Sequence, residues 1–251
     1  MKRIFLLNIL IFFCLASFGQ SPKELWTEAN NNYSKANFED ALAGFKKIEE
    51  SGYASPALYY NMGNTYFKLK QIGKSILYYE RALKLDPSDK DALNNVQLAR
   101  EFTLDRIEEV PDFILNTWIK SLNYSFSSDV WAYIALVLLA GVALFLLLFK
   151  YGPTSRVRKG SFFASMVFLL FFCISIYFSW SQKHVYNLKD TAIIMKPVST
   201  IKSSPDNSGN TLFILHEGTK VSLLDEIGEW KKIELADGRQ GWVSSLDIEI
   251  I

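Results

Sequence analysis

The sequence has little of what metal or nucleic-acid chemistry requires. It contains two histidines and two cysteines, and Cys14 and Cys173 both lie in strongly apolar runs, so no zinc or other metal site is expected. Lys and Arg number 27 against 26 Asp and Glu, so no excess of positive charge favours nucleic acid as a partner. The 251 residues are 49% hydrophobic, which is enough to build folded cores.

Residues 1–19 have the pattern of a cleavable signal peptide. A basic start at Lys2 and Arg3 precedes an apolar stretch over residues 4–16, and the small residues Ser17 and Gly19 stand at the −3 and −1 positions. We expect cleavage after Gly19. A lipoprotein signal at Cys14 is disfavoured, because two phenylalanines precede this cysteine where small residues are needed.

Two later runs, residues 131–149 and 162–180, contain no charged residue. Each is long enough to cross a bilayer, since about 20 residues at about 1.5 Å each cover the ~30 Å hydrocarbon core; the alternative is a pair of buried core helices. The loop between them, residues 150–161, carries four basic residues and no acidic one, which predicts a cytoplasmic loop. Both flanking parts are then exported, as the signal peptide also requires.

Residues 20–109 predict an all-α domain of tetratricopeptide repeats with a capping helix. Residues 56–89 form a 34-residue unit with two helical patterns and a closing Pro87, and Ser75 stands where the repeat usually has Ala. The first helix has an apolar stripe with a small residue that lets the second helix approach: Tyr59, Met62, Gly63 and Tyr66. The facing stripe of the second helix consists of Ile72, Ile76, Tyr79, Ala82 and Leu83.

The segments on either side of this unit fit the same plan. Residues 25–51 repeat it less perfectly, with Ala29 at the usual glycine position. Residues 91–106 predict the capping helix, because five apolar residues follow helical spacing: Ala92, Leu93, Val96, Leu98 and Ala99.

A stack of such repeats has a concave groove that binds protein segments. Five residues of the first helix of the second repeat occupy the positions that usually face this groove: Tyr60, Asn61, Asn64, Phe67 and Lys68. Asn64 and Lys68 are suited to a peptide backbone or carboxylate. The alternative is that both asparagines only solvate or brace the pair of helices.

Residues 110–130 predict an amphipathic juxtamembrane segment. Its aromatic and aliphatic residues cluster on one helical face: Phe113, Ile114, Trp118, Ile119 and Leu122. This composition is typical of a helix in the membrane interface, and the competing interpretation is a helix packed on the repeats.

Residues 181–251 predict a small all-β domain. Short β-rich runs alternate with turn signals at Pro205-Asp206, Glu217-Gly218 and Asp237-Gly238. This stretch, with its Glu217 to Val221 segment, Trp230 and the Gly241-Trp242-Val243 triplet, resembles the bacterial SH3-like domain, which implies an SH3-like barrel.

Two tryptophans, Trp230 and Trp242, are candidates for an aromatic groove that binds peptide or cell-wall glycopeptide; the alternative, favoured for Trp242, is that they complete the core. We expect His216 to be a plain strand residue. Neither soluble domain has an evident set of nucleophile, base and metal ligands. We therefore expect no enzyme, no catalytic residue and no cofactor.

The order of these segments resembles the BatE-type aerotolerance proteins, a family of multidomain membrane proteins with tetratricopeptide repeats, a two-helix transmembrane hairpin and an SH3-like domain. The resemblance extends to the stretch from Val110-Pro111 to Trp131. It implies a bacterial inner-membrane protein with both soluble domains periplasmic, which works with von Willebrand A-domain membrane proteins and a MoxR-type ATPase in aerotolerance or envelope stress.

The expected function is thus a non-enzymatic scaffold or adaptor. The repeat groove is expected to hold a protein partner while the SH3-like domain engages a second protein or the cell wall. Two alternatives stay open: a peptidoglycan-binding sensor that signals across the membrane, and an accessory subunit of an envelope hydrolase. A cytoplasmic loop of only 12 residues disfavours the sensor.

Overall fold

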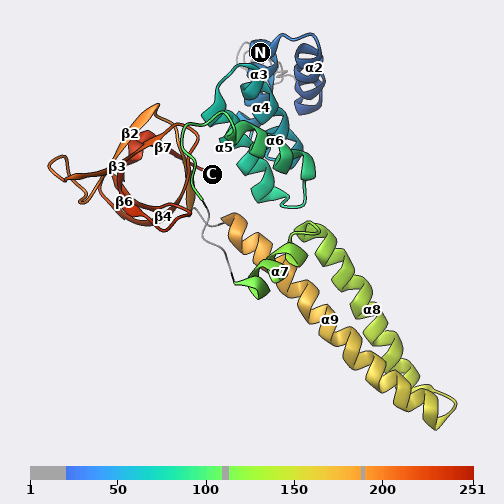
Figure 1. Cartoon of the computed structure of the whole chain (residues 1–251). Coiled ribbons are helices and arrows are strands. Elements are labelled where there is room, and N and C mark those ends of the chain that lie inside the picture. The colour runs from blue at the N-terminus through green and yellow to red at the C-terminus, as the bar shows by residue number, and fades with distance from the viewer. Residues whose placement is uncertain (1–20, 109–112, 188–189) are drawn as a thin grey trace, which may run out of the picture. The chain divides into compact units, whose positions relative to one another are not determined.

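The computed structural model describes residues 21–108, 113–187 and 190–251. The predicted signal peptide and its cleavage site lie outside these residues. The chain divides into two compact units, Met1–Ala54 and Ser55–Ile251, which are described separately. Figure 1 shows the helical and β elements of both units.

The first unit contains a pair of helices, α2 (Pro22–Ser34) and α3 (Phe38–Glu50). The helix α2 begins with a capping box, in which the Ser21 hydroxyl accepts a hydrogen bond from the Glu24 N–H and the Glu24 carboxylate accepts one from the Ser21 N–H. A Cβ on Gly44 would lie 2.9 Å from the Cβ of Ala29, so the glycine allows the helices to approach closely. The pair occupies the range predicted for the first repeat.

The second unit opens with the helices α4 (Pro56–Lys68) and α5 (Ile72–Leu85). A Cβ on Gly63 would lie 2.6 Å from the Tyr79 ring, so only glycine fits at this crossing. The unusual Ser75 is explained by its hydroxyl, which donates a 2.9 Å hydrogen bond to the buried Gly63 carbonyl. The predicted stripes are largely buried, with Met62, Tyr66, Ile76, Tyr79 and Ala82 at the centre.

The helix α6 (Lys90–Arg100) follows, with Asp89 as its N-cap. It buries Ala92, Val96 and Ala99. Leu93 and Leu98, by contrast, are 44% and 45% exposed, so the predicted five-residue apolar stripe is narrower than the spacing indicated.

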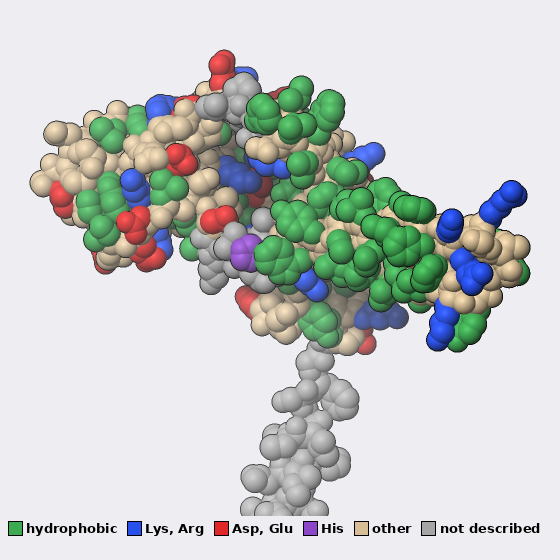
Figure 2. Space-filling view, turned by 90° about the horizontal axis from the view of Figure 1, so that it is seen from below, with side chains coloured by type: hydrophobic (Ala, Val, Ile, Leu, Met, Phe, Trp, Pro, Cys, Tyr) green, Lys and Arg blue, Asp and Glu red, His purple; other side chains and the backbone are tan. Residues whose placement is uncertain are grey.

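Three helices form the next part of the chain: α7 (Ile114–Asn123), α8 (Ser128–Tyr151) and α9 (Ser155–Asn187). α8 and α9 pack side by side as a hairpin (Figure 1), with the Phe145 and Phe168 rings 5.0 Å apart. Both are long and apolar enough to cross a membrane, and they contain the predicted spans 131–149 and 162–180. Figure 2 shows hydrophobic side chains gathered over this part of the molecule and Lys and Arg side chains beyond them at one end.

The C-terminal part is an antiparallel sheet of seven described strands in the order β3-β2-β6-β5-β4-β1-β7. Their bounds are β1 (Thr191–Ile194), β2 (Val198–Lys202), β3 (Thr211–His216), β4 (Lys220–Ile227), β5 (Trp230–Glu234), β6 (Gln240–Ser244) and β7 (Ile248–Ile250), with a 3-10 turn, η1 (Ser245–Asp247), before the last strand. Gly218 and Gly238 have positive φ in turns between strands, as the turn signals predicted.

This sheet curls in Figure 1 but is not closed, because β3 and β7 stand at its two ends and no ladder joins them in the described strands. Its core contains eight buried aliphatic residues: Ala192, Ile194, Ile201, Leu215, Val221, Ile233, Leu235 and Val243. Ile107, from the segment that follows α6, packs against this core. The antiparallel sheet agrees with the predicted all-β domain, whereas a closed barrel is not shown.

Candidate functional site

The predicted groove residues all lie on α4, and the structure gives them different roles. Lys68 is exposed, whereas Tyr60, Asn61, Asn64 and Phe67 are half-buried. The Asn64 side-chain oxygen accepts hydrogen bonds from the Tyr79 hydroxyl, at 2.6 Å, and from the Asn95 side-chain amide, at 2.9 Å. Asn64 therefore braces α4 against α5 and α6.

The helix α6 and the turn after it add residues that the sequence analysis did not assign to this face. Asn95 also donates to the Tyr60 hydroxyl at 3.2 Å, and the Phe102 ring meets the Phe67 ring edge-on at 5.5 Å. Asn95 and Leu98 lie three residues apart on one side of α6, and Phe102 lies in the turn directly after the helix. Leu98 and Phe102 are 45% and 62% exposed.

We call the combined surface the α4–α6 face. It combines the exposed apolar side chains of Leu98 and Phe102 with the exposed cation of Lys68, which suits an extended polypeptide. It consists of Tyr60, Asn61, Asn64, Phe67, Lys68, Asn95, Leu98 and Phe102.

The predicted aromatic pair of the sheet lies on neighbouring strands, β5 and β6. The register pairs Trp242 with Lys232 and Trp230 with Ser244, so both tryptophans occupy one face of the sheet, opposite the face that carries Ile233 and Val243. Lys202 lies over the Trp230 ring, with its Nζ 5.8 Å from the centroid. Trp242 is only 9% exposed and lies outside the core cluster, whereas Trp230 is half-buried.

A buried carboxylate on α5 joins three elements of the second unit. The Glu80 side chain is 7% exposed and accepts hydrogen bonds from Arg100 of α6, at 2.5 Å, and from Lys220 of β4, at 2.6 Å. A buried charge is stable only when it is paired, so this carboxylate requires both cations nearby. We call this arrangement the Glu80 bridge; sequence reasoning did not predict it.

A second carboxylate, Asp105, holds the β3–β4 turn, and we call its contacts the Asp105 clasp. It accepts hydrogen bonds from the His216 backbone N–H and the Thr219 hydroxyl, both at 2.6 Å, and lies 2.7 Å from the His216 ring Nδ1. Burial alone raises the pKa of Asp105, but the hydrogen bonds from Thr219 and His216 outweigh it, and the pKa lies below the ordinary value. The predicted strand residue His216 is thus also a contact residue.

The same turn caps α5. The helix has no side-chain cap of its own at Gln71, and Glu217 supplies one by accepting a 3.0 Å hydrogen bond from the Gly73 N–H. Near the other end of α5, Arg81 bonds to Glu249 and the Ile250 carbonyl, both at 3.0 Å, and Lys84 bonds to the Ile251 carbonyl at 2.8 Å. The sheet therefore contacts α5 at both ends.

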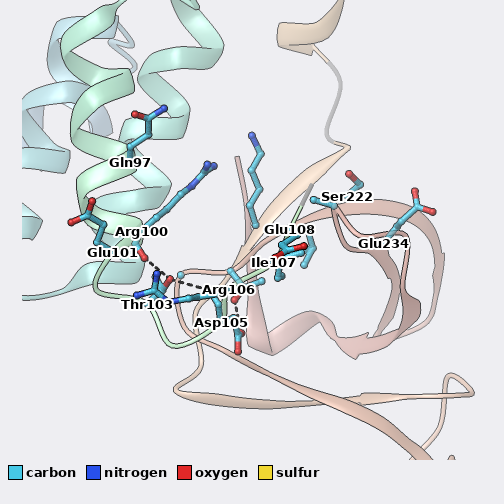
Figure 3. Close-up of a pocket in the computed structure, with 15 residues that line it drawn as sticks. Gln97, Arg100, Glu101, Thr103, Asp105, Arg106, Ile107, Glu108, Ser222 and Glu234 are labelled. Atoms are coloured by element: carbon cyan, nitrogen blue, oxygen red, sulfur yellow. Dashed lines mark hydrogen bonds between the residues drawn. The ribbon is translucent and has the colours of Figure 1, made fainter. Parts of the chain in front are cut away.

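A cleft of about 630 Å³ lies beside these contacts, between the end of α6 and strand β4 (Figure 3). Both positively and negatively charged residues line the cleft, among them Arg100, Asp105, Arg106, Lys220 and Glu234. Arg100 and Lys220 already pair with Glu80, and Asp105 with Thr219 and His216. In the part of the chain that the structure describes, no group of three or more His, Cys, Asp or Glu could hold a metal ion.

Comparison with known proteins identifies one of these segments. The tetratricopeptide repeat family model matches residues 56–89, which comprise α4, α5 and the turn that follows them. Repeats of this family suggest a role in protein–protein interaction. No curated protein matches the chain.

The Glu80 bridge predicts a large effect of a small substitution. Glu80→Gln removes the charge that Arg100 and Lys220 share and should lower the free energy of unfolding by about 1.5–3 kcal/mol, the range for hydrogen bonds to charged groups. Urea unfolding followed by tryptophan fluorescence measures this. The matched control is Glu226→Gln, whose ion pair with Lys231 involves a glutamate that is 59% exposed and should cost no more than about 0.5 kcal/mol. Equal losses in both variants would contradict the bridge.

The Asp105 clasp predicts a dependence on acid. A carboxyl whose folded pKa is lowered stabilises the fold above its unfolded pKa of about 3.9, and this contribution disappears as pH falls through the folded pKa. Asp105→Asn should therefore be less stable than the wild type at pH 7 and lose less stability between about pH 5 and pH 3. Thermal unfolding across this range measures both effects. Asp225→Asn, at an exposed position of β4, should retain the wild-type profile; an unchanged profile in Asp105→Asn would refute the clasp.

Proposed function

We propose that the protein is a non-enzymatic, membrane-anchored scaffold whose α4–α6 face holds an extended segment of a partner protein. The observation that carries this proposal is that the sheet contacts one helix of the repeat and leaves apolar side chains exposed elsewhere. The sheet contacts α5, through Arg81, Lys84 and the Glu80 bridge, while Leu98 of α6 and Phe102, just after α6, stay exposed. The family match of residues 56–89 supports the same kind of function.

The finer proposal concerns the setting of this scaffold. The order of repeats, amphipathic helix, two apolar helices and β-rich domain supports a BatE-type aerotolerance protein in a bacterial inner membrane, with the sheet as a bacterial SH3-like domain. The partners would then be von Willebrand A-domain membrane proteins. The contacts of Glu80 with Lys220 and of Asp105 with His216 favour one side of the membrane for both soluble parts.

A second candidate function is cell-wall or peptide binding by the sheet. Trp230, Trp242 and the neighbouring Lys202 lie on one face, and an aromatic platform with a cation suits a glycopeptide or peptide ligand. Under this hypothesis the protein is a peptidoglycan-binding sensor or an accessory subunit of an envelope hydrolase.

Capture of the partner tests the role of the α4–α6 face. A Lys68→Glu and Leu98→Ser double variant changes two exposed residues of this face and leaves the Asn64 brace in place. Loss of roughly 1–3 kcal/mol of contacts should weaken partner binding by about five- to 150-fold. Cross-linking with mass spectrometry in native membranes identifies the partner, and pull-down with the purified chain measures the loss.

A matched control carries the same changes elsewhere. In Lys90→Glu with Leu246→Ser, a lysine at the start of α6 and a leucine that is 87% exposed are altered, and capture should stay at the wild-type level. If the control loses as much capture as the test variant, or if the test variant loses none, the partner uses another surface. A Trp230→Ala variant that alone abolishes capture would favour the second candidate function.

The proposed orientation predicts the outcome of reporter fusions. Alkaline phosphatase should be active when fused after Arg100 or after Ile251 and inactive when fused after Arg156, because the basic loop stays in the cytoplasm. Changing Arg156, Arg158 and Lys159 to Asp should weaken this pattern. The reverse pattern of activities would invert the topology and remove the periplasmic setting.

A further inference from the structure

The helix α7 exposes an apolar stripe in the part of the chain next to the two apolar helices. Six large apolar side chains on it and directly before it are between 52% and 67% exposed: Phe113, Ile114, Leu115, Trp118, Ile119 and Leu122. Asn116, Thr117 and Ser121 lie between them in the sequence. An exposed patch of this kind on a ten-residue helix marks a surface that is normally covered.

A polar lock holds α7 to the ends of α8 and α9. Asn123, the only buried residue of α7, accepts a 2.9 Å hydrogen bond at its carbonyl from the Trp131 indole N–H of α8. Gln182 of α9 donates to the same carbonyl at 2.6 Å, to the Asn123 side-chain oxygen at 3.1 Å and to the Phe126 carbonyl at 3.0 Å. The position of α7 along the hairpin is therefore fixed.

The lock sets this position at the level where the spans meet water. Trp131 is the first residue of one predicted span and Trp180 is the last residue of the other, so both lie at the same end of the hairpin. Tryptophan rings favour the membrane–water boundary. Since Trp131 bonds directly to Asn123, the C-terminal end of α7 lies at the same level. The Ser128 and Ser179 hydroxyls link α8 and α9 there, each donating to the other residue's carbonyl, at 3.1 and 3.0 Å.

We propose that α7 lies in the lipid interface at the Trp131 end of the hairpin, with its apolar stripe among the acyl chains. Lipid is the occupant, because α8 and α9 expose their own apolar side chains, such as Leu136 and Leu170, to the same surroundings. The stripe continues that surface, and the polar residues of α7 remain available to water and headgroups. α7 and the hairpin then form a three-helix membrane unit.

Spin labels on the full-length chain in phosphatidylethanolamine and phosphatidylglycerol vesicles test the proposal. Cys14→Ser and Cys173→Ser give a cysteine-free background. Single cysteines are then placed on the stripe (Leu115→Cys, Trp118→Cys, Ile119→Cys) and on the polar residues (Asn116→Cys, Ser121→Cys). All five positions are exposed, so the labels should not disturb the fold.

The readout is the collision rate of each label with oxygen, which concentrates in lipid, relative to a water-soluble nickel chelate. Labels on the stripe should reach the ratio found at Leu136→Cys on α8, and labels on the polar residues should approach the ratio at Asn94→Cys, an exposed residue of α6. A helical alternation of the ratio between residues 115 and 121 is the expected signature.

Three results would overturn the proposal. Water-like ratios at every α7 position would show that the stripe does not enter lipid. Stripe labels shielded from both reagents would show that protein covers it, and shielding that grows with protein density in the vesicle would identify a second copy as that protein. A water-like ratio at Leu136→Cys would show that α8 does not cross the bilayer. That result would also contradict the proposed membrane-anchored scaffold.

Discussion

The second unit depends on one buried charge. Glu80 lies on the side of α5 away from α4, where its carboxylate is shielded from water and held by Arg100 and Lys220. A lone carboxylate in that position would be costly, and two cations from different parts of the chain neutralise it only when α6 and β4 both lie against α5. The repeat and the sheet are therefore joined by an electrostatic requirement, which the Asp105 clasp and the Glu217 cap of α5 reinforce.

This requirement explains how a short repeat stack stays folded and keeps a free surface. One side of α5 packs on α4 through Tyr79, whose ring lies against Gly63, and the other side contacts the sheet through Glu80 and Ile76, which meet Lys220 and Gly218. The terminal helix α6 has a narrow buried stripe, which consists of Ala92, Val96 and Ala99. What it exposes, including Leu98, adds to the surface beside α4. The sheet thus packs on α5 in addition to α6, the helix that occupies the range of the predicted capping helix.

Local periodicity made much of the fold predictable. The stripe around Gly63, the uncharged runs of α8 and α9 and the turns at Gly218 and Gly238 each leave a mark within a short window of sequence, and each has its counterpart in the structure. The contacts of the candidate site were harder to predict, because they join residues that are far apart in the sequence. Nothing near His216 indicates that its partner is Asp105, and Asn64 carries no local sign that Tyr79 and Asn95 already occupy its oxygen. Repeat positions alone suggest that such residues point to a ligand, and tertiary contacts decide whether they do.

The Asp105 clasp has a consequence for the order of assembly. Asp105 and His216 are 111 residues apart, and both apolar helices lie between them in the chain. During synthesis the repeat is complete long before the β3–β4 turn exists, so α5 lacks its Glu217 cap and Glu80 lacks Lys220 through the whole period in which the hairpin is made. Closing so long a loop is slow compared with helix formation. The repeat therefore passes through an open stage, with Ile107 not yet in a core, and reaches its final stability only after both apolar helices and the sheet have been made.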